Sequence, residues 1–345
     1  MFNKIVDDEI FKLVENQVKP FRNHYSPEFL LEKYKYGVSD VMVYFNSGGM
    51  NIVGNQDLFH NKHIVNVRAR MFGQLMQHAM QKYPSIMSSL NLTVPFCFSD
   101  TSDLPLQPIP CLVFSKAAYS TNILIPSLDN IFQSNHLQQV DAYDTPLSQK
   151  ENRMCFFGSF TGNVVDKIKD NTRLQIAAKA ANSDSIVCRI SRPPMFPEDS
   201  FQEAINRANE VCPELNNEII LNDERGIGIP EQLRYKYQLC VDGHVSAWSR
   251  LPWQMYSNCI PFKVRNRKKS WIEWFYPLMD FSKHCIEVDM DDIEEAYKYI
   301  ESNTQLQEDI SRSGKEFITK YWNQNLAIDV FVQTLILLNQ IQNRT

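Results

Sequence analysis

The sequence has no excess of basic residues, since its 345 residues include 35 Lys and Arg against 40 Asp and Glu, a net charge of −5. Phosphate backbones are normally bound by basic surfaces, so this balance argues against a nucleic-acid partner. No apolar run is long enough to cross a bilayer, and residues 1–9 lack the apolar core of a signal peptide. We therefore expect a cytoplasmic protein, peripheral at the membrane if it contacts one.

The sequence also lacks Cys-x-x-Cys pairs. Its eight cysteines are scattered, and most stand among apolar residues, which favours reduced core thiols over a disulfide framework or a zinc site. His60 and His63 have no neighbouring ligand set. The acidic run Asp289–Asp292 directly precedes a predicted helix, as capping residues do. We expect no metal and no cofactor other than a substrate.

What is present is typical of a soluble globular chain, with 43% hydrophobic and 22% charged residues. Beyond an amphipathic helical stretch in residues 1–35, strands alternate with helices, which predicts an α/β fold with a mainly parallel sheet in the second half. The predicted strands are 41–45, one or two within 52–64, 94–98, 111–114, 154–158, 186–190, 238–241, 259–264 and 286–288. The predicted helices are 68–82, 172–181, 292–301, 306–321 and 327–341.

The length suffices for two domains. A turn-rich segment, Asp144–Pro146, followed by the polar residues Glu151–Arg153, predicts a boundary near residue 150. The expected division is a first domain over 1–150, a second over 151–325, and a C-terminal helix in 326–345 that packs back on the first.

The most informative stretch is Tyr235–Gly243, an apolar strand that stops at a glycine, followed by Ser246–Arg250. A strand that ends at a close glycine turn before a helix N-terminus is the layout of an anion site. We expect Arg250 about one turn into that helix, where its guanidinium could bond a phosphate.

Three ordered segments resemble glycosyltransferase family 90, which includes capsule-associated, lipopolysaccharide-modifying and protein O-glucosylating transferases. The first runs from Asp103-Leu104-Pro105 through Ile109–Lys116 to Ile125-Pro126. The second is Phe156–Gly162, and the third runs from Tyr235 through Arg250 to Trp271–Pro277. The resemblance covers roughly residues 95–305. It implies a GT-B fold, with two Rossmann-like domains facing across a cleft, and an inverting, metal-independent transfer from a UDP-sugar held mainly by the second domain.

The resemblance also implies roles for individual residues. Asp103 matches the family's proposed general base, although in this loop it could equally cap a turn. Lys116 falls on the acceptor side. The residues that would bind the donor are Gly158, Ser159, Thr161, Arg173, Gly243, His244, Ser246, Ala247 and Arg250.

The sequence departs from the family at Phe157 and Phe160, where many relatives carry arginines. Arg173 could substitute for them, or could be a surface charge of its helix. His244 could bond a phosphate or serve only the turn, and Glu273 could bond a ribose or be a buried structural acid. The basic run Lys263–Lys269 is either a solvated turn or a contact for an anionic glycan or membrane.

The function expected from these residues is transfer of a sugar to a surface glycan such as lipopolysaccharide or capsule. Two alternatives remain open. One is a binding module of the same fold that has lost catalysis, as Phe157 and Phe160 suggest. The other is an unrelated α/β interaction protein.

Overall fold

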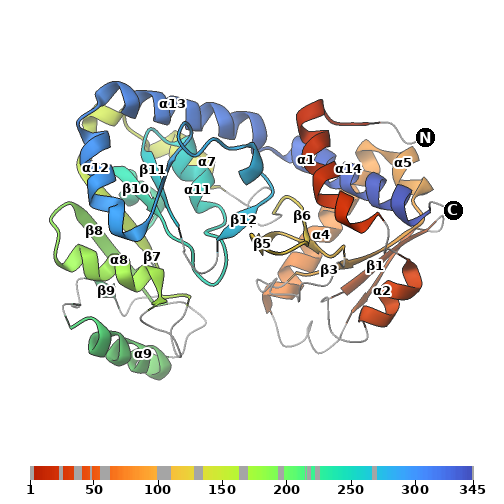
Figure 1. Cartoon of the computed structure of the whole chain (residues 1–345), viewed down its shortest axis with the longest axis horizontal. Helices are drawn as coiled ribbons and strands as arrows, with labels where there is room; N and C mark the ends of the chain where they lie inside the picture. Colours follow the sequence, from red (N-terminus) through yellow and green to blue (C-terminus); the bar gives the residue numbers. More distant parts are fainter. Residues whose placement is uncertain are drawn as a thin grey trace. The chain divides into compact units, whose positions relative to one another are not determined.

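The structure is a computed structural model. It describes residues 4–22, 26–34, 41–46, 49–54, 63–98, 110–127, 135–162, 170–192, 198–213, 215, 219–221, 226–265 and 270–343. The chain forms two α/β units (Figure 1). Unit 1 comprises residues 1–133, 271–278 and 321–345, and unit 2 comprises residues 134–270 and 279–320.

Unit 1 is built on a mixed five-stranded sheet in the order β2-β1-β3-β4-β6. β1 pairs antiparallel with β2 and β3, whereas β3, β4 and β6 are parallel. A separate antiparallel ladder joins β5 to β12. The strands are β1 (Val41–Asn46), β2 (Gly49–Gly54), β3 (Leu92–Phe96), β4 (Leu112–Val113), β5 (Ser115–Ala117), β6 (Ile123–Leu124) and β12 (Trp271–Glu273).

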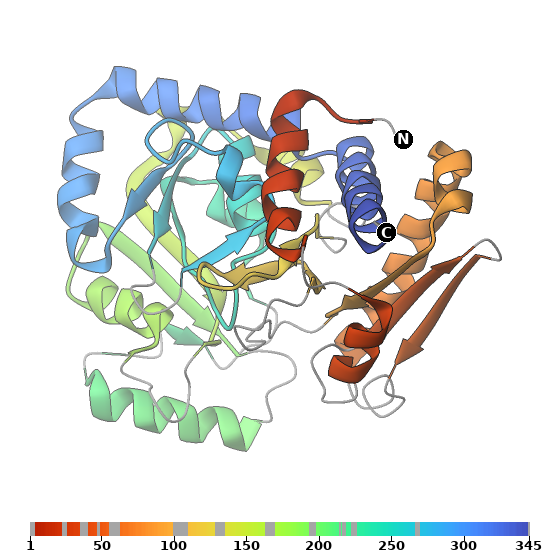
Figure 2. The ribbon, with the colours of Figure 1, turned by 45° about the vertical axis from the view of Figure 1, so that its right-hand side comes forward.

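The C-terminal helix supplies much of the unit 1 core. The unit's helices are α1 (Asp8–Val18), η1 (Lys19–Phe21), α2 (Pro27–Tyr34), α4 (His63–Lys82), α5 (Pro84–Ser89), η4 (Tyr276–Leu278) and α14 (Gln324–Gln342). α14 packs against α1, α4 and β3 (Figure 2). Twelve of its residues are buried, so it is apolar nearly all round, as an internal helix must be.

Unit 2 is built on a parallel six-stranded sheet in the order β13-β11-β10-β7-β8-β9. From β7 the chain adds β8 and β9 on one side, and then crosses to add β10, β11 and β13 on the other. This is the strand order of a dinucleotide-binding fold, and it has a switch point between β7 and β10. The strands are β7 (Glu151–Ser159), β8 (Ile186–Ser191), β9 (Ile220–Leu221), β10 (Tyr235–Cys240), β11 (Ile260–Val264) and β13 (Ile286–Val288).

Helices connect these strands, which makes the parallel pairing possible. The helices between successive strands are α8 (Thr172–Ala181), α9 (Glu198–Val211), α10 (Ile229–Gln232) and α11 (Arg250–Tyr256). Before the first strand lie α7 (His136–Tyr143) and η2 (Leu147–Gln149), and after the last lie η5 (Met290–Asp292), α12 (Ile293–Glu301) and α13 (Thr304–Tyr321). The predicted α/β fold and the parallel sheet of the second half are confirmed.

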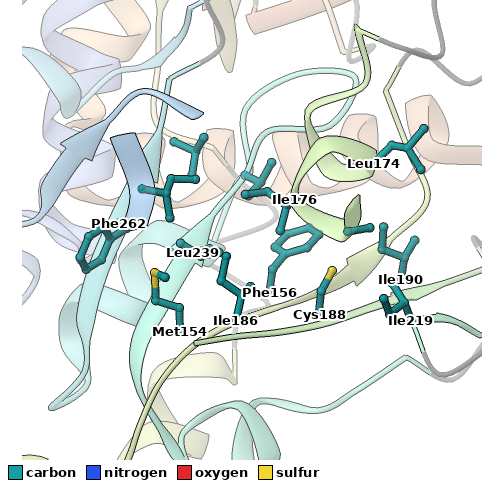
Figure 3. Packing of buried hydrophobic residues seen from close by; sticks show 14 of the residues in the cluster. Met154, Phe156, Leu174, Ile176, Ile186, Cys188, Ile190, Ile219, Leu239 and Phe262 are labelled. Atoms are coloured by element: carbon teal, nitrogen blue, oxygen red, sulfur yellow. The ribbon is translucent and has the colours of Figure 1, made fainter. Parts of the chain in front are cut away.

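The core of unit 2 lies between its central strands and α8 (Figure 3). Met154 and Phe156 of β7, Cys188 of β8 and Leu239 of β10 are all buried there. Strands covered on both faces carry near-continuous apolar sequences rather than alternating ones. That is why the sequence pattern identified β7, β8, β10 and β11.

The division of the chain differs from the expected one in three places. Residues 321–325, expected in the second domain, lie in unit 1. Residues 135–150 lie in unit 2, because Asp144 accepts hydrogen bonds from Lys150 Nζ (2.5 Å) and from the backbone N of Asn258 (2.6 Å). Residues 271–278 lie in unit 1, because β12 pairs with β5. In the predicted strand region 52–64, β2 ends at Gly54 and α4 begins at His63. All eight cysteines are free, and seven are buried.

Candidate functional site

Two turns predicted separately from the sequence meet at the carboxyl edge of the unit 2 sheet. One follows β7, which continues through Gly158 and ends at Ser159, one residue later than predicted; the other follows β10 and runs to the start of α11 at Arg250. A Cβ atom on Gly158 would lie 3.1 Å from Nη2 of Arg250. A Cβ atom on Gly243 would overlap Thr161 Oγ1. The two turns therefore touch at the switch point, where ligands of open α/β sheets bind.

The side chain of Arg173 links these two turns by hydrogen bonds. Its Nη1 donates to the carbonyl of Ser159 (2.6 Å), and its Nε and Nη2 donate to the carbonyls of Asp242 and Val241 (3.3 Å each). The side chain is buried. Burial, followed by the charge on Arg250, lowers the Arg173 pKa to about 9. Arg173 is thus not the surface charge that the sequence allowed, and three of its five N–H groups are committed to the backbone.

Arg250 is a second cation at the same edge, and no carboxylate in the described part of the chain pairs with it. Its Nη1 donates to Oε1 of Gln232 (3.3 Å). Its guanidinium lies 5.3 Å from the Phe156 ring centroid, while that of Arg173 lies 5.6 Å from the same ring. Burial lowers the pKa of Arg250. The sequence placed Arg250 about one turn into the helix, but it is the first residue of α11.

The acid next to these arginines is already neutralised. Asp242 Oδ1 accepts from Lys263 Nζ (2.5 Å) and from the backbone N of Ala247 (3.0 Å). The pair therefore shapes the loop and leaves the charge of Arg250 uncompensated. It also uses the Ala247 N–H, which is then not available to a ligand.

The contact between Lys263 and Asp242 also bears on the basic run Lys263–Lys269, for which the sequence allowed a solvated turn or an anion-binding surface. The Lys263 side chain is 6% exposed and points inward to Asp242. Arg265 pairs with Asp289 (3.1 Å) and Glu287 (3.8 Å). Residues 266–269 lie outside the described residues. The first and third residues of the run therefore do not form an open basic surface.

Other residues of the loop after β10 differ in exposure. His244 is exposed, whereas Ser246 is 2% exposed and its Oγ has no hydrogen-bond partner in the described part of the chain. Trp248 has a φ of 50°, a region in which a bulky side chain is strained. Such strain is found at functional loops, where the surrounding structure holds it.

The two phenylalanines that stand in place of arginines face apolar surroundings. Phe157 packs edge-on against Tyr235 at 5.6 Å, and Phe160 against Phe201 at 6.0 Å. Both are buried. They are core residues, so neither places a side chain beside Arg250.

The sequence pattern did not identify three residues that contact or influence this edge. Asn171 caps α8 by accepting from the backbone N of Arg173 and Leu174, and its Nδ2 donates to the Thr161 carbonyl (3.1 Å). An Asn directly before a helical pattern is a capping signal that could have identified it. Gln232 and His136 gave no such signal. The pKa of His136 is lowered by burial and then by the charge on Arg250.

The remaining predicted residues do not belong to the described part of unit 2. Asp103 falls outside the described residues, so its role stays a prediction. Lys116 and Glu273 lie in unit 1, where both side chains are buried. Among the described residues, no three His, Cys, Asp or Glu side chains gather as metal ligands would. None of the helices in those residues is both long and apolar enough to cross a membrane.

Comparison with known proteins gives a match to one family model, "Glycosyl transferase family 90", over residues 216–340. This segment includes β10, the loop after it and Arg250. A curated protein, "Uncharacterized protein 179R" of Invertebrate iridescent virus 6, is 30% identical over 113 residues, which are 31% of this chain. The matched part spans 9% of that protein's length.

Solved glycosyltransferase structures are also similar at low identity. The C-terminal domain of a group 1 family glycosyl transferase (LpcC) from Francisella tularensis is 15% identical, with a TM-score of 0.32, and the match covers 56% of this chain and 96% of that one. A glycosyltransferase from Rickettsia africae ESF-5 is 10% identical, with a TM-score of 0.39, and the match covers 100% and 85%.

Proposed function

We propose that the chain transfers a sugar from a nucleotide-sugar donor to a glycan acceptor, because residues 216–340 match the model "Glycosyl transferase family 90". The donor diphosphate would bind where β7 and β10 end, with Arg250 as its main cation. Gly158 and Gly243 let β7 and the loop after β10 approach each other closely at this place, because a Cβ at either position would crowd Arg250 or Thr161.

The observation that carries this proposal is the uncompensated charge of Arg250. A guanidinium that is partly withdrawn from water, as that of the half-buried Arg250 is, gains from a charged or strongly polar partner. Arg250 has one amide oxygen and an aromatic face. A diphosphate would supply the missing negative charge, and Arg250 could bind it through two parallel N–H groups.

The finer parts of the proposal are those that the resemblance to the family implies. We assign a UDP-linked donor, an inverting displacement and no metal ion. Arg250, together with the charge of Arg173 behind it, would stabilise the leaving diphosphate. The proposed acceptor is a surface glycan such as lipopolysaccharide or capsule, and the proposed location is the cytoplasm.

The test is UDP affinity, measured by calorimetry, for Arg250→Ala and for the control Arg207→Ala. Arg207 is an exposed residue of α9 in the same unit. We expect Arg250→Ala to weaken binding by about 1.5–3 kcal/mol, as for a hydrogen bond to a charged group, and Arg207→Ala to bind like the parent. Equal affinity in a folded Arg250→Ala protein would remove Arg250 from the site.

For the chemical step we propose Asp103 as the base that takes the acceptor proton. Asp103→Asn keeps the size of the side chain but cannot accept a proton at neutral pH. We expect unchanged UDP affinity and transfer at least roughly a hundredfold slower, as general-base removal typically costs. A variant that transfers sugar at the parent rate would leave Asp103 as a turn residue.

A second candidate, a nucleotide-sugar-binding module without catalysis, is favoured by the positions of Phe157 and Phe160. Both side chains are buried in apolar packing, so the site has fewer cations than the family pattern implies. The two proposals differ in one measurement. UDP binding without turnover of any nucleotide sugar would support the binding module.

A further inference from the structure

Lys116 is a buried cation in unit 1. It lies in the middle of β5, opposite Ile272 of β12, and is 9% exposed. Its Nζ donates to the backbone carbonyl of Asn122 (2.6 Å). Within the described residues no carboxylate pairs with it. An ammonium has three donors, so two of them remain for another partner.

Asn122 adds a second donor at the same place. Its side chain is 4% exposed, and its Nδ2 has no acceptor in the described part of the chain. The backbone N of Asn122 donates to Ser120 Oγ (3.2 Å), which fixes the turn between β5 and β6. Because Nζ of Lys116 touches the carbonyl of Asn122 itself, the unused donors of both side chains come from one small region.

Buried donors without acceptors are rare in native proteins. A water molecule could accept from Asn122, but it would leave the charge of Lys116 uncompensated. An acidic group has two or three oxygens and a negative charge, so it can satisfy both donors together.

We propose that Lys116 and Asn122 form a subsite for an acidic group, a carboxylate or a phosphate, on the molecule that unit 1 binds. This rests on the proposed function only in taking that molecule to be the sugar acceptor. The acceptor would then be an acidic glycan, such as one bearing a uronic acid or a phosphorylated sugar. Anion binding by unit 1 is itself independent of any transfer reaction.

The pKa of Lys116 supports this assignment. Burial lowers it to about 8, because the charged form loses hydration. The ammonium is therefore charged at neutral pH, and it loses its proton as the pH rises past about 8. Anion affinity should fall over the same range, and it should fall less in a variant that lacks the amine.

The test uses the full chain and calorimetric titration with glucuronate, inorganic phosphate and neutral glucose at matched ionic strength. The variants are Lys116→Met, which removes the charge at similar size, and Asn122→Asp, which places a carboxylate beside the ammonium. Lys12→Met, at an exposed position of α1, is the control. Comparison of glucuronate with phosphate identifies the acidic group.

We expect at least one of the two anions to bind the parent and Lys12→Met, and its affinity to drop at least tenfold in both test variants. Asn122→Asp should also unfold at a higher temperature, since its carboxylate neutralises the buried ammonium. If Lys116→Met does not fold, Asn122→Asp decides the question. Absence of anion binding to the parent, or parent-like anion affinity in a stabilised Asn122→Asp protein, would overturn the subsite.

UDP titrations of the same variants separate this inference from the proposed function. We expect parent-like UDP affinity in both, because Lys116 and Asn122 belong to unit 1 and Arg250 to unit 2. Failure of the parent to bind UDP would refute the donor site without bearing on the anion subsite.

Discussion

At the residue scale, Arg173 shows why a side chain's chemistry does not reveal its partner. The sequence allowed a phosphate ligand or a surface charge. The structure instead directs the guanidinium to three carbonyls at the ends of β7 and β10. Those carbonyls come together only because the two strands are neighbours in the sheet. The glycines and Arg250, by contrast, could be found from sequence, because their turns are encoded locally.

His136 gives a prediction about pH. Burial and the charge of Arg250 lower its pKa, which favours the neutral ring. A diphosphate on Arg250 would offset that charge and raise the pKa of His136. Binding of UDP would therefore take up protons, and the His136 contribution to affinity would grow as the pH falls toward the usual histidine range, about 6.5.

Calorimetry in buffers of different ionisation enthalpy measures this proton uptake directly. We expect a fractional uptake near pH 6.5 for the parent and a smaller one for His136→Gln, which removes the titrating ring. The comparison between the two proteins cancels the titration of UDP itself. Equal uptake in both would show that His136 is not coupled to the ligand.

At the element scale, the pattern of apolar residues was enough to find most strands and helices. α8 and β13 have their predicted ends, and α14 is longer than predicted by a few residues at its start and one at its end. The pairing of β5 with β12 could not be predicted, since the strands are short and lie more than 150 residues apart. α9 was not predicted either.

The glycines of these elements give a matched pair of substitutions. A Cβ on Gly243 would overlap Thr161 Oγ1 and lie 3.0 Å from Nη2 of Arg173, whereas one on Gly73 in α4 would meet nothing within 4 Å. Gly243→Ala should therefore destabilise the protein by about 1–3 kcal/mol, as overpacking does, and weaken UDP binding. Gly73→Ala should stabilise it by roughly 0.5–1 kcal/mol through helix propensity.

Urea unfolding and UDP titration of both variants check this pair. The direction of the two stability changes is the informative result, because the chemical change is the same. A Gly243→Ala protein as stable as the parent, with parent-like UDP affinity, would mean that Thr161, in the turn after β7, is not in tight contact with Gly243 in the loop after β10.

At the scale of the whole molecule, the sequence indicated two α/β parts but not where the chain crosses between them. A local composition change suggested residue 150, whereas the hydrogen bond that the backbone N of Asn258 donates to Asp144 attaches the preceding segment to unit 2. Residues 271–278 return to unit 1 through a strand of three residues. Crossings of this kind depend on pairing between distant segments, which a local pattern does not contain.

The return of the chain to unit 1 gives the last prediction. α14 places Phe331, Leu335 and Leu338 in the unit 1 core, each with 0% exposure. Burial of each such side chain contributes roughly 1.5–3 kcal/mol, so losing these three alone removes an amount comparable with a domain's usual stability of about 5–15 kcal/mol. A chain that ends at residue 320 should therefore lose the fold of unit 1 and keep that of unit 2.

Hydrogen exchange resolves the two units in one experiment. In the shortened chain we expect amides of β1 and β3 to lose protection, while those of β7 and β10 keep it and UDP still binds. Removal of residues 344–345 alone is the control and should change neither. Retained protection in β1 would show that unit 1 folds without α14. Loss of protection in β7 would show that unit 2 depends on unit 1, and that its sheet, although complete in residues 134–270 and 279–320, does not fold by itself.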